Sequence, residues 1–96
     1  MAVKVKIPTM MRQAVGGAPV VESDGETVRD VIADIERRYP ALAGSILGRD
    51  GGLHRFVNVY VNSEDVRYLG ALETAVAEGD TVAILPAVAG GSRDRV

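Results

Sequence analysis

TVRDVIADIERRYP, residues 27–40, is the stretch that decides how this chain of 96 residues folds. Thr27 stands just before the first apolar residue and predicts a helix N-cap, with Asp30 three residues later as a variant of the capping box. The apolar side chains that follow recur at helical spacing and form one stripe: Val28, Val31, Ile32, Ile35 and Tyr39. Pro40 disfavours helical backbone at the residue before it. The stretch therefore predicts one amphipathic helix that ends near Tyr39.

The segments on both sides of this helix alternate apolar and polar residues, as half-buried strands do. Before the helix we expect strands at 3–7 and 19–22, which form a hairpin with a long connection. After the helix we expect strands at 54–61, 65–68 and 81–87. Turns are expected at 23–25, 62–64 and 78–80, and single helical turns at 41–47 and 72–76.

One helix and about five strands predict an α+β domain of two layers, in which the helix covers one face of a mixed sheet. The first and last strands can both lie centrally only if they run parallel, and the helix supplies the crossover that such pairing requires. That arrangement is the β-grasp of ubiquitin-like proteins. In strand 54–61, the three valines are expected to face the helix, because they are uniformly apolar. His54, Phe56, Asn58 and Tyr60 are then expected on the opposite face.

Composition excludes several classes of protein. The chain is 47% hydrophobic and 25% charged, which is typical of one globular domain whose core consists of Val, Ile, Leu and Ala. A net charge of −2 provides no basic field for nucleic acid or for acidic lipid. The chain has no cysteine, and no apolar run approaches the roughly 20 residues of a membrane span. We expect a cytoplasmic protein that binds neither nucleic acid nor membrane.

The stretch PAVAGGSRDRV, residues 86–96, contains a Gly-Gly pair shortly after the last expected strand. Glycine lacks a Cβ, so its backbone can pass through a narrow channel. Such a tail suits a protein whose carboxylate an enzyme must bring to the α-phosphate of ATP, because the domain can dock outside while the tail reaches the reaction centre. The expected organisation is a domain at 1–87 and a flexible tail at 88–96 that carries Gly90 and Gly91.

Three stretches resemble the ubiquitin-like sulfur-carrier proteins of the ThiS/MoaD family, and most closely its CysO branch. They are VKIPTMMR near the start, GETVRDVIADIERRYP at 25–40, and LHRFVNVYVNSEDVRYLGALETAVAEGDTVAILPAVAGG at 53–91. Together with their spacing, they cover nearly all of residues 1–91. The block at 53–91 is the most specific of the three.

The resemblance implies a protein co-substrate rather than an enzyme, with no cofactor of its own. Gly91, preceded by Ala89 and Gly90 in the tail, would be adenylated by an E1-like enzyme of the ThiF/MoeB type that uses ATP. The product would become a thiocarboxylate that donates sulfur to a synthase for cysteine, thiosugar or another sulfur-containing metabolite. In the CysO branch, a JAMM-type metalloprotease then releases cysteine from the carrier.

The sequence departs from this family at one point, because Ser92 and four further residues follow Gly91. An amide at Gly91 supplies no oxyanion to adenylate, so the bond between Gly91 and Ser92 must be cut first. Residues 92–96 then mark a precursor, an artificial addition or a relative that has lost the activity. Cleavage by a JAMM-type metalloprotease is the expected route, since small residues on both sides of the bond favour an exposed site.

Other residues have simpler explanations than a chemical site. His54 is the single histidine and has no cysteine or carboxylate at ligand spacing, so we expect an exposed strand position and no metal or catalytic group. The acidic residues Asp24, Glu26, Asp30 and Asp34 fit helix capping and a solvated helix face, on which Asp34 and Arg38 form a favourable i,i+4 pair. The glycine-rich loop 48–52 lacks the lysine and serine of a phosphate loop.

Two outward aromatics, Phe56 and Tyr60, are expected to form a small apolar patch that docks the activating enzyme. Three other functions remain open beside sulfur transfer. The chain could be a ubiquitin-like modifier joined to lysines, the small subunit of a molybdopterin-synthase-like complex, or a noncovalent regulatory subunit with an inert tail.

Overall fold

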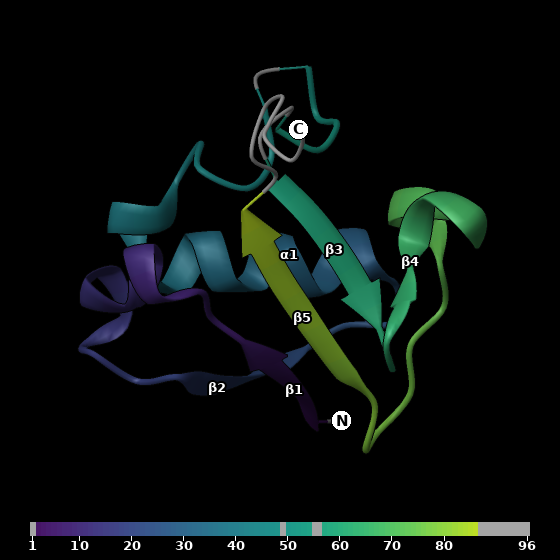
Figure 1. The fold of residues 1–96 in the computed structure, drawn as a ribbon, viewed down its shortest axis with the longest axis horizontal. Helices are drawn as coiled ribbons and strands as arrows, with labels where there is room; N and C mark the ends of the chain where they lie inside the picture. Colours follow the sequence, from purple (N-terminus) through teal and green to yellow (C-terminus); the bar gives the residue numbers. More distant parts are fainter. Residues whose placement is uncertain (1, 49, 55–56, 87–96) are drawn as a thin grey trace, which may run out of the picture.

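The computed structural model describes residues 2–48, 50–54 and 57–86, which form a sheet covered by one helix (Figure 1). The strands are β1 Ala2–Lys6, β2 Val20–Asp24, β3 Val57–Val61, β4 Glu64–Asp65 and β5 Thr81–Pro86, in the sheet order β2-β1-β5-β3-β4. Helix α1 spans Val28–Arg38. Short 3-10 helices fill the connections: η1 Thr9–Val15, η2 Pro40–Leu42, η3 Val66–Tyr68 and η4 Ala71–Glu73.

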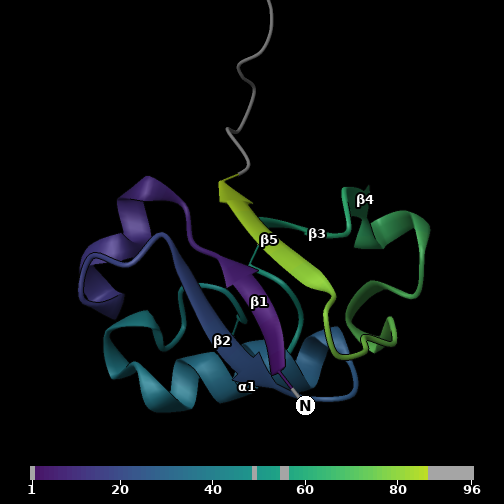
Figure 2. The same ribbon diagram turned by 90° about the horizontal axis from the view of Figure 1, so that it is seen from below.

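The two strands at the centre of the sheet come from opposite ends of the described chain. β1 pairs in parallel with β5, with Lys4 opposite Thr81 and Lys6 opposite Ala83. β2 lies antiparallel on the far side of β1, and β3 lies antiparallel on the far side of β5 (Figure 2). This topology, with α1 in the crossover, confirms the predicted β-grasp.

Local signals start and stop α1 as the sequence predicts. The Thr27 hydroxyl accepts a hydrogen bond from the backbone N–H of Asp30 at 3.2 Å. The Asp30 carboxylate accepts from the N–H of Glu26 at 3.4 Å, so the reciprocal bond reaches one residue further back than in a standard capping box. The helix ends at Arg38, and the N–H of Tyr39 donates to the Ile35 carbonyl at 2.9 Å.

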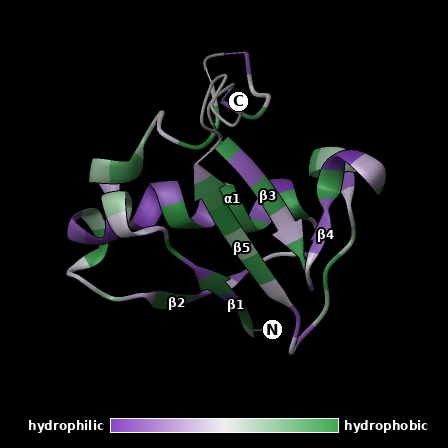
Figure 3. Ribbon diagram, viewed as in Figure 1, coloured by the Kyte–Doolittle hydropathy of each residue, from purple (hydrophilic) through white to green (hydrophobic). Residues whose placement is uncertain are grey.

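The core between α1 and the sheet is entirely aliphatic in the described part of the chain. Val28, Val31, Ile32 and Ile35 are fully buried, as the helical stripe predicts. They face the inward hydrophobic residues of the strands, which are Val3, Val5, Val21, Val57, Val59, Val61, Val82 and Ile84. In Figure 3 the apolar segments gather on the central strands, whereas α1 alternates between polar and apolar residues. Every buried hydrophobic here is Val, Ile or Leu, without the alanine that composition had suggested.

Two expectations about β2 and the turn after it are wrong. The strand covers Val20–Asp24 rather than 19–22, so Ser23 and Asp24 belong to the strand and not to a turn. The chain turns at Gly25, which packs against the first turn of α1. A Cβ added to Gly25 would lie 2.7 Å from the backbone N of Val31 and 2.8 Å from the Cβ of Asp30, so only glycine fits without displacing the helix.

The strands after α1 are shorter than predicted because local hydrogen bonds bend the chain. The N–H of His54 donates to the Ile46 carbonyl at 2.7 Å, which holds His54 beside the preceding loop and outside the strand. The described strand β3 is Val57–Val61, and residues 55 and 56 lie outside the described residues. The expected strand 65–68 ends after Asp65, whose carboxylate accepts from the N–H of Arg67 at 2.9 Å and starts η3.

The helical connections also differ in extent from the predictions. The turn expected at 41–47 is limited to η2, and the turn expected at 72–76 is displaced to η4. The stretch between the first two strands, expected to be irregular, contains η1. The predicted boundary between domain and tail lies at Ala87, outside the described residues.

Asp34 fastens α1 to β2 instead of lying on a solvated helix face. Its Oδ2 accepts from the hydroxyl of Ser23 at 2.8 Å and from the N–H of Asp24 at 3.3 Å. Arg38 pairs with the same oxygen at 3.1 Å, as predicted, and Arg37 pairs with Oδ1. The Asp34 side chain is 14% exposed. Burial raises its pKa, but the bonds from Ser23 and Asp24 and the charges of both arginines outweigh this and hold the pKa below its ordinary value.

We expect Ile32→Ala and Ile35→Ala each to lower the free energy of unfolding by about 2–5 kcal/mol, because each substitution leaves a cavity between α1 and the sheet. Denaturant titration measures the loss. Arg37→Ala, on the exposed side of the same helix, is the control and should change stability by less than about 0.5 kcal/mol. Similar losses in all three variants would contradict the assigned core.

Asp34 should make the protein less stable in acid. A carboxyl whose folded pKa is depressed contributes stability that is present above the unfolded pKa and is lost as the pH falls through the folded pKa. For Asp34 that loss sets in below its ordinary pKa of 3.8. Asp34→Asn should therefore flatten the dependence of unfolding free energy on pH in this acid range. Glu78→Gln, in the exposed turn before β5, should leave it unchanged, and equal slopes in wild type and Asp34→Asn would refute the assignment.

Candidate functional site

The tail predicted to carry the chemistry starts from the middle of the sheet. β5 is bordered by β1 on one side and by β3 on the other, and it ends at Pro86. Ala89, Gly90, Gly91 and Ser92 lie outside the described residues, so the structure defines the root of the tail and its surroundings. The residues around Pro86 are therefore the candidate site.

The face of the sheet opposite α1, which we call the open face, borders this root. Side chains alternate along a strand, so the residues next to the buried valines belong to the open face. Across three neighbouring strands, Lys6, Ala83 and Tyr60 are paired in one row of this face. Asn58 and Leu85 form the next row. Tyr60 and Asn58 are half-buried and belong to this face, as predicted. Phe56, the other predicted docking residue, lies outside the described residues.

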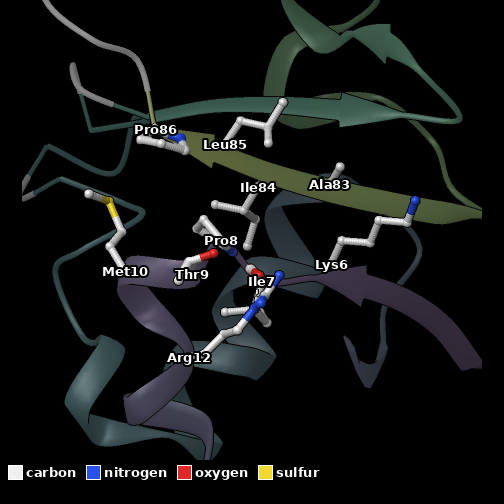
Figure 4. A pocket seen from close by; sticks show the side chains of 10 residues that line it. All are labelled: Lys6, Ile7, Pro8, Thr9, Met10, Arg12, Ala83, Ile84, Leu85 and Pro86. Carbon is white, nitrogen blue, oxygen red and sulfur yellow. Dashed lines mark hydrogen bonds between the residues drawn. The ribbon is translucent and has the colours of Figure 1, made fainter. Parts of the chain in front are cut away.

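A groove lies between β5 and η1 at the root of the tail, with a volume of about 560 Å³. We call it the tail-root groove. Its main lining residues are Lys6, Pro8, Met10, Arg12, Leu85 and Pro86. Figure 4 shows Met10 and Pro86 at the left, Leu85 at the top, Lys6 at the right and Arg12 below. Met10 is 70% exposed and Leu85 is 44% exposed, which is unusual for large apolar side chains.

The η1 helix builds one wall of this groove through backbone signals in the sequence. Pro8 has extended backbone (φ −67°, ψ 153°), and its carbonyl accepts from the N–H of Met11 at 2.9 Å. Gly16 ends the helix at φ 73°, a conformation that favours glycine. Arg12 Nε donates to the Ile7 carbonyl at 3.0 Å, which fixes the arginine stem beside the groove.

Charge at the groove differs from charge over the whole chain. Lys6 and Arg12 line it, and none of the described residues that line it is acidic, although the chain carries a net charge of −2. Such a surface is complementary to a partner that combines apolar and acidic side chains. Sequence reasoning did not identify Met10, Arg12 or Leu85 as site residues, since only the fold brings η1 beside the end of β5.

A second groove of about 560 Å³ crosses β5 on the open face and shares Lys6, Ala83 and Leu85 with the tail-root groove. Its other lining residues are Tyr60, Asn62, Ser63 and Thr81. Asn62 and Ser63 have φ values of 49° and 76°, as in the tight turn that joins antiparallel strands. The Asn62 side chain donates to Asp80 at 3.1 Å and accepts from the N–H of Thr81 at 3.0 Å. The hydrogen bond from Asn62, with a second from the N–H of Ala77, lowers the pKa of Asp80. These contacts fix the loop that borders the groove.

The remaining sequence candidates are dispersed over the fold. His54 is half-buried next to loop 48–52, not on a strand. In that loop the Asp50 carboxylate accepts from the N–H of Gly52 at 2.9 Å. Of the acidic residues 24, 26, 30 and 34, the Asp30 carboxylate serves the cap of α1 and the Asp34 carboxylate attaches α1 to β2. Asp24 and Glu26 take part through their backbone N–H groups. Within residues 2–48, 50–54 and 57–86, no three His, Asp or Glu side chains gather as they would around a metal ion. Over the same residues, α1 and the short helices are too brief or too polar to cross a membrane.

Comparison with known proteins agrees with this architecture. The sequence model of the ThiS family matches residues 5–91. The sulfur carrier protein CysO of Mycobacterium tuberculosis is 50% identical over 93 residues, with 95% of this chain and 100% of that protein covered. The CysO chain in the crystal structure of the Amycolatopsis orientalis BexX/CysO complex is 51% identical and superimposes with a TM-score of 0.85, covering 94% of this chain and 100% of that chain. Small archaeal modifier protein 3 of Haloferax volcanii is 34% identical over 93 residues, again covering 95% of this chain and 100% of that protein.

Proposed function

This chain belongs to the ThiS family, and we propose that it is a sulfur carrier protein that holds its sulfur at the carboxyl group of Gly91. The observation that carries the proposal is the likeness to CysO over nearly the whole chain, with a family match that runs as far as Gly91. This chemistry suits a chain without cysteine, because an acyl group at Gly91 would hold the sulfur and no thiol would be needed on the carrier.

The proposed chemistry has two steps. A carboxylate oxygen of Gly91 attacks the α-phosphorus of ATP, and pyrophosphate leaves as the acyl-adenylate forms. A sulfide sulfur then attacks the acyl carbon, the bond to the AMP oxygen breaks, and Gly91 becomes a thiocarboxylate. The activating enzyme supplies the ATP site, so the carrier acts as a co-substrate with no cofactor of its own.

The fold supports this function through the position of the tail root. β5 is held on both sides by β1 and β3, so a tail that follows Pro86 starts from a rigid point. The open face and the tail-root groove next to it offer exposed apolar area with a basic rim. An enzyme can dock there while the tail reaches its reaction centre. The Amycolatopsis relative forms a complex with BexX, and we propose that this chain likewise works through partner proteins.

Three kinds of partner follow from the proposal. An E1-like enzyme of the ThiF/MoeB type activates Gly91, and a synthase receives the sulfur for cysteine, a thiosugar or another metabolite. A JAMM-type metalloprotease cuts between Gly91 and Ser92. Residues 92–96 stand outside the family match, in accordance with their removal before activation.

Protein modification is the second candidate function, because the small archaeal modifier protein of Haloferax volcanii matches this chain over the same extent. An activated Gly91 would then form an amide with a lysine amine instead of accepting sulfide. Conjugates that carry this chain on lysines of other proteins in cell extracts would favour modification, whereas the thiocarboxylate alone favours sulfur transfer.

We expect the chain that ends at Gly91 to become a thiocarboxylate on incubation with the activating enzyme, ATP and a sulfide source, and the 96-residue chain to stay unchanged. Intact mass measures the exchange of one oxygen for sulfur. A chain that ends at Gly90 is the matched control for the position of the carboxylate. Equal conversion of the Gly91 and 96-residue chains without a protease would refute processing, and no conversion of either would refute sulfur carriage by this route.

Docking on the open face should depend on the exposed Leu85 and on the patch that the sequence predicts for Phe56 and Tyr60. In the chain that ends at Gly91, Leu85→Ser and the double variant Phe56→Ser/Tyr60→Ser should each raise the KM of activation by about tenfold, which corresponds to the loss of a moderate hot spot. Leu69→Ser is the matched control, since Leu69 is 43% exposed against 44% for Leu85 but lies after η3. Circular dichroism confirms the fold of each variant. Unchanged KM in both test variants, or an equal rise in Leu69→Ser, would contradict the docking surface.

A further inference from the structure

Positive charge in the tail-root groove is not neutralised by the described part of this chain. Lys6 and Arg12 line the groove, and within residues 2–48, 50–54 and 57–86 neither side chain forms an ion pair with a carboxylate. The other described arginines all pair with acidic side chains: Arg29 with Glu73, Arg37 and Arg38 with Asp34, and Arg67 with Asp65. Lys6 and Arg12 can therefore bind an anion from outside the chain.

The Arg12 side chain is held in place before any ligand binds. Its Nε donates to the Ile7 carbonyl at 3.0 Å, and Figure 4 shows the side chain reaching from η1 to Ile7. No described residue accepts a hydrogen bond from its two Nη groups. In a planar guanidinium these groups lie side by side, at a spacing that matches the two oxygens of a carboxylate. Because the stem is already fixed, such a pair forms at a small cost in side-chain entropy.

Apolar side chains border these cations and restrict the kind of anion that fits. Met10 and Leu85 are both exposed, and Pro86 completes this side of the groove. A free phosphate would leave these side chains in water, whereas a protein segment with an acidic and a large apolar side chain would cover both parts of the groove. A nucleic acid is disfavoured, because two cations on a chain of net charge −2 neutralise few phosphates.

The groove also lies at the origin of the tail, because Pro86 is one of its lining residues. Gly91 is the fifth residue after Pro86, and five extended residues span at most roughly 18 Å. A protein that acts on the carboxyl group of Gly91 is therefore within reach of the groove.

We propose that the tail-root groove binds a segment of the activating enzyme in which an acidic side chain stands beside a large apolar one. The carboxylate pairs with the Nη groups of Arg12 and with Lys6, and the apolar side chain packs against Met10 and Leu85. This inference rests on the proposed function, because it names the contact that brings the activating enzyme to the tail.

The test measures the dissociation constant of the 96-residue chain and the activating enzyme by calorimetry, since docking at the groove needs no free carboxyl group at Gly91. Arg12→Gln should raise the Kd about tenfold, as expected for the loss of an interface hot spot, and Lys6→Gln should raise it less. Met10→Ser should also weaken binding, because it removes an apolar contact. The Kd of wild type should rise between about 50 and about 300 mM salt, and that of Arg12→Gln/Lys6→Gln should rise less, because salt screens the ion pairs.

Arg37→Gln is the matched control, because it removes the same charge from α1, on the covered face of the sheet, and its Kd should equal that of wild type. Lys6→Gln leaves the hydrogen bond between Arg12 and Ile7 in place, so it separates a lost ion pair from a loosened η1. Circular dichroism shows that each variant is folded.

Unchanged Kd in folded Arg12→Gln and Lys6→Gln would overturn the proposal, as would an equal rise in Arg37→Gln or no binding of wild type. Displacement of the enzyme by inorganic phosphate at constant ionic strength would assign the groove to phosphate and overturn it as well. Conversion of the chain that ends at Gly91 is a separate measurement. Conversion with unchanged Kd in the groove variants would refute the groove contact alone, whereas groove-dependent binding without conversion would refute sulfur carriage alone.

Discussion

The contact between the aliphatic stripe of α1 and the inward valines and isoleucines of the central strands is the interaction on which the rest of this structure depends. It buries Ile32 and Ile35 completely, and among the described residues Tyr39 packs against it only partly buried. After β2 the chain crosses the covered face of the sheet through α1. The strands that follow α1 then lie on the other side of β1 from β2, with β5 next to β1 in the centre of the sheet. The same contact leaves the opposite face without a covering layer. The core, the root of the tail and the open face are thus three results of one packing arrangement.

The sequence predicted the layers of the fold because its periodic signals are strong. The stripe from Val28 to Ile35 and the alternation around Val57, Val59 and Val61 report burial directly. Predictions of shorter elements and of single contacts were wrong where a side chain forms a hydrogen bond that the sequence pattern does not indicate. Asp65 ends β4 by accepting from the N–H of Arg67, and no alternation of apolar residues signals such a bond. Asp34 has the spacing of a surface ion pair, but the fold brings Ser23 within 2.8 Å of it, which spacing along one helix cannot indicate.

The candidate site was predictable only in part, for a related reason. Tyr60 could be assigned to the open face because strand alternation fixes the side on which it lies. Met10 and Arg12 could not be assigned to the tail-root groove, since more than sixty residues separate η1 from β5 in the sequence and the two meet only in the folded domain. Family resemblance points to Gly91 as the reactive residue, but it says little about the surface that surrounds the tail root. That surface follows from the parallel pairing of β1 and β5.

The pairing of β1 with β5 also has a consequence for the synthesis of this protein in the cell. Contacts between the first and last of the described strands have a larger sequence separation than the other strand pairings, which slows folding and delays its completion. β1 emerges early from the ribosome but has no central neighbour until residues 81–86 have followed. A fragment that stops before β5 leaves both β1 and β3 with an unpaired side, a state that aggregates readily. The open face beside Pro86 therefore exists only on chains that have been translated through β5, so a partner that recognises this face selects folded molecules without a separate quality check.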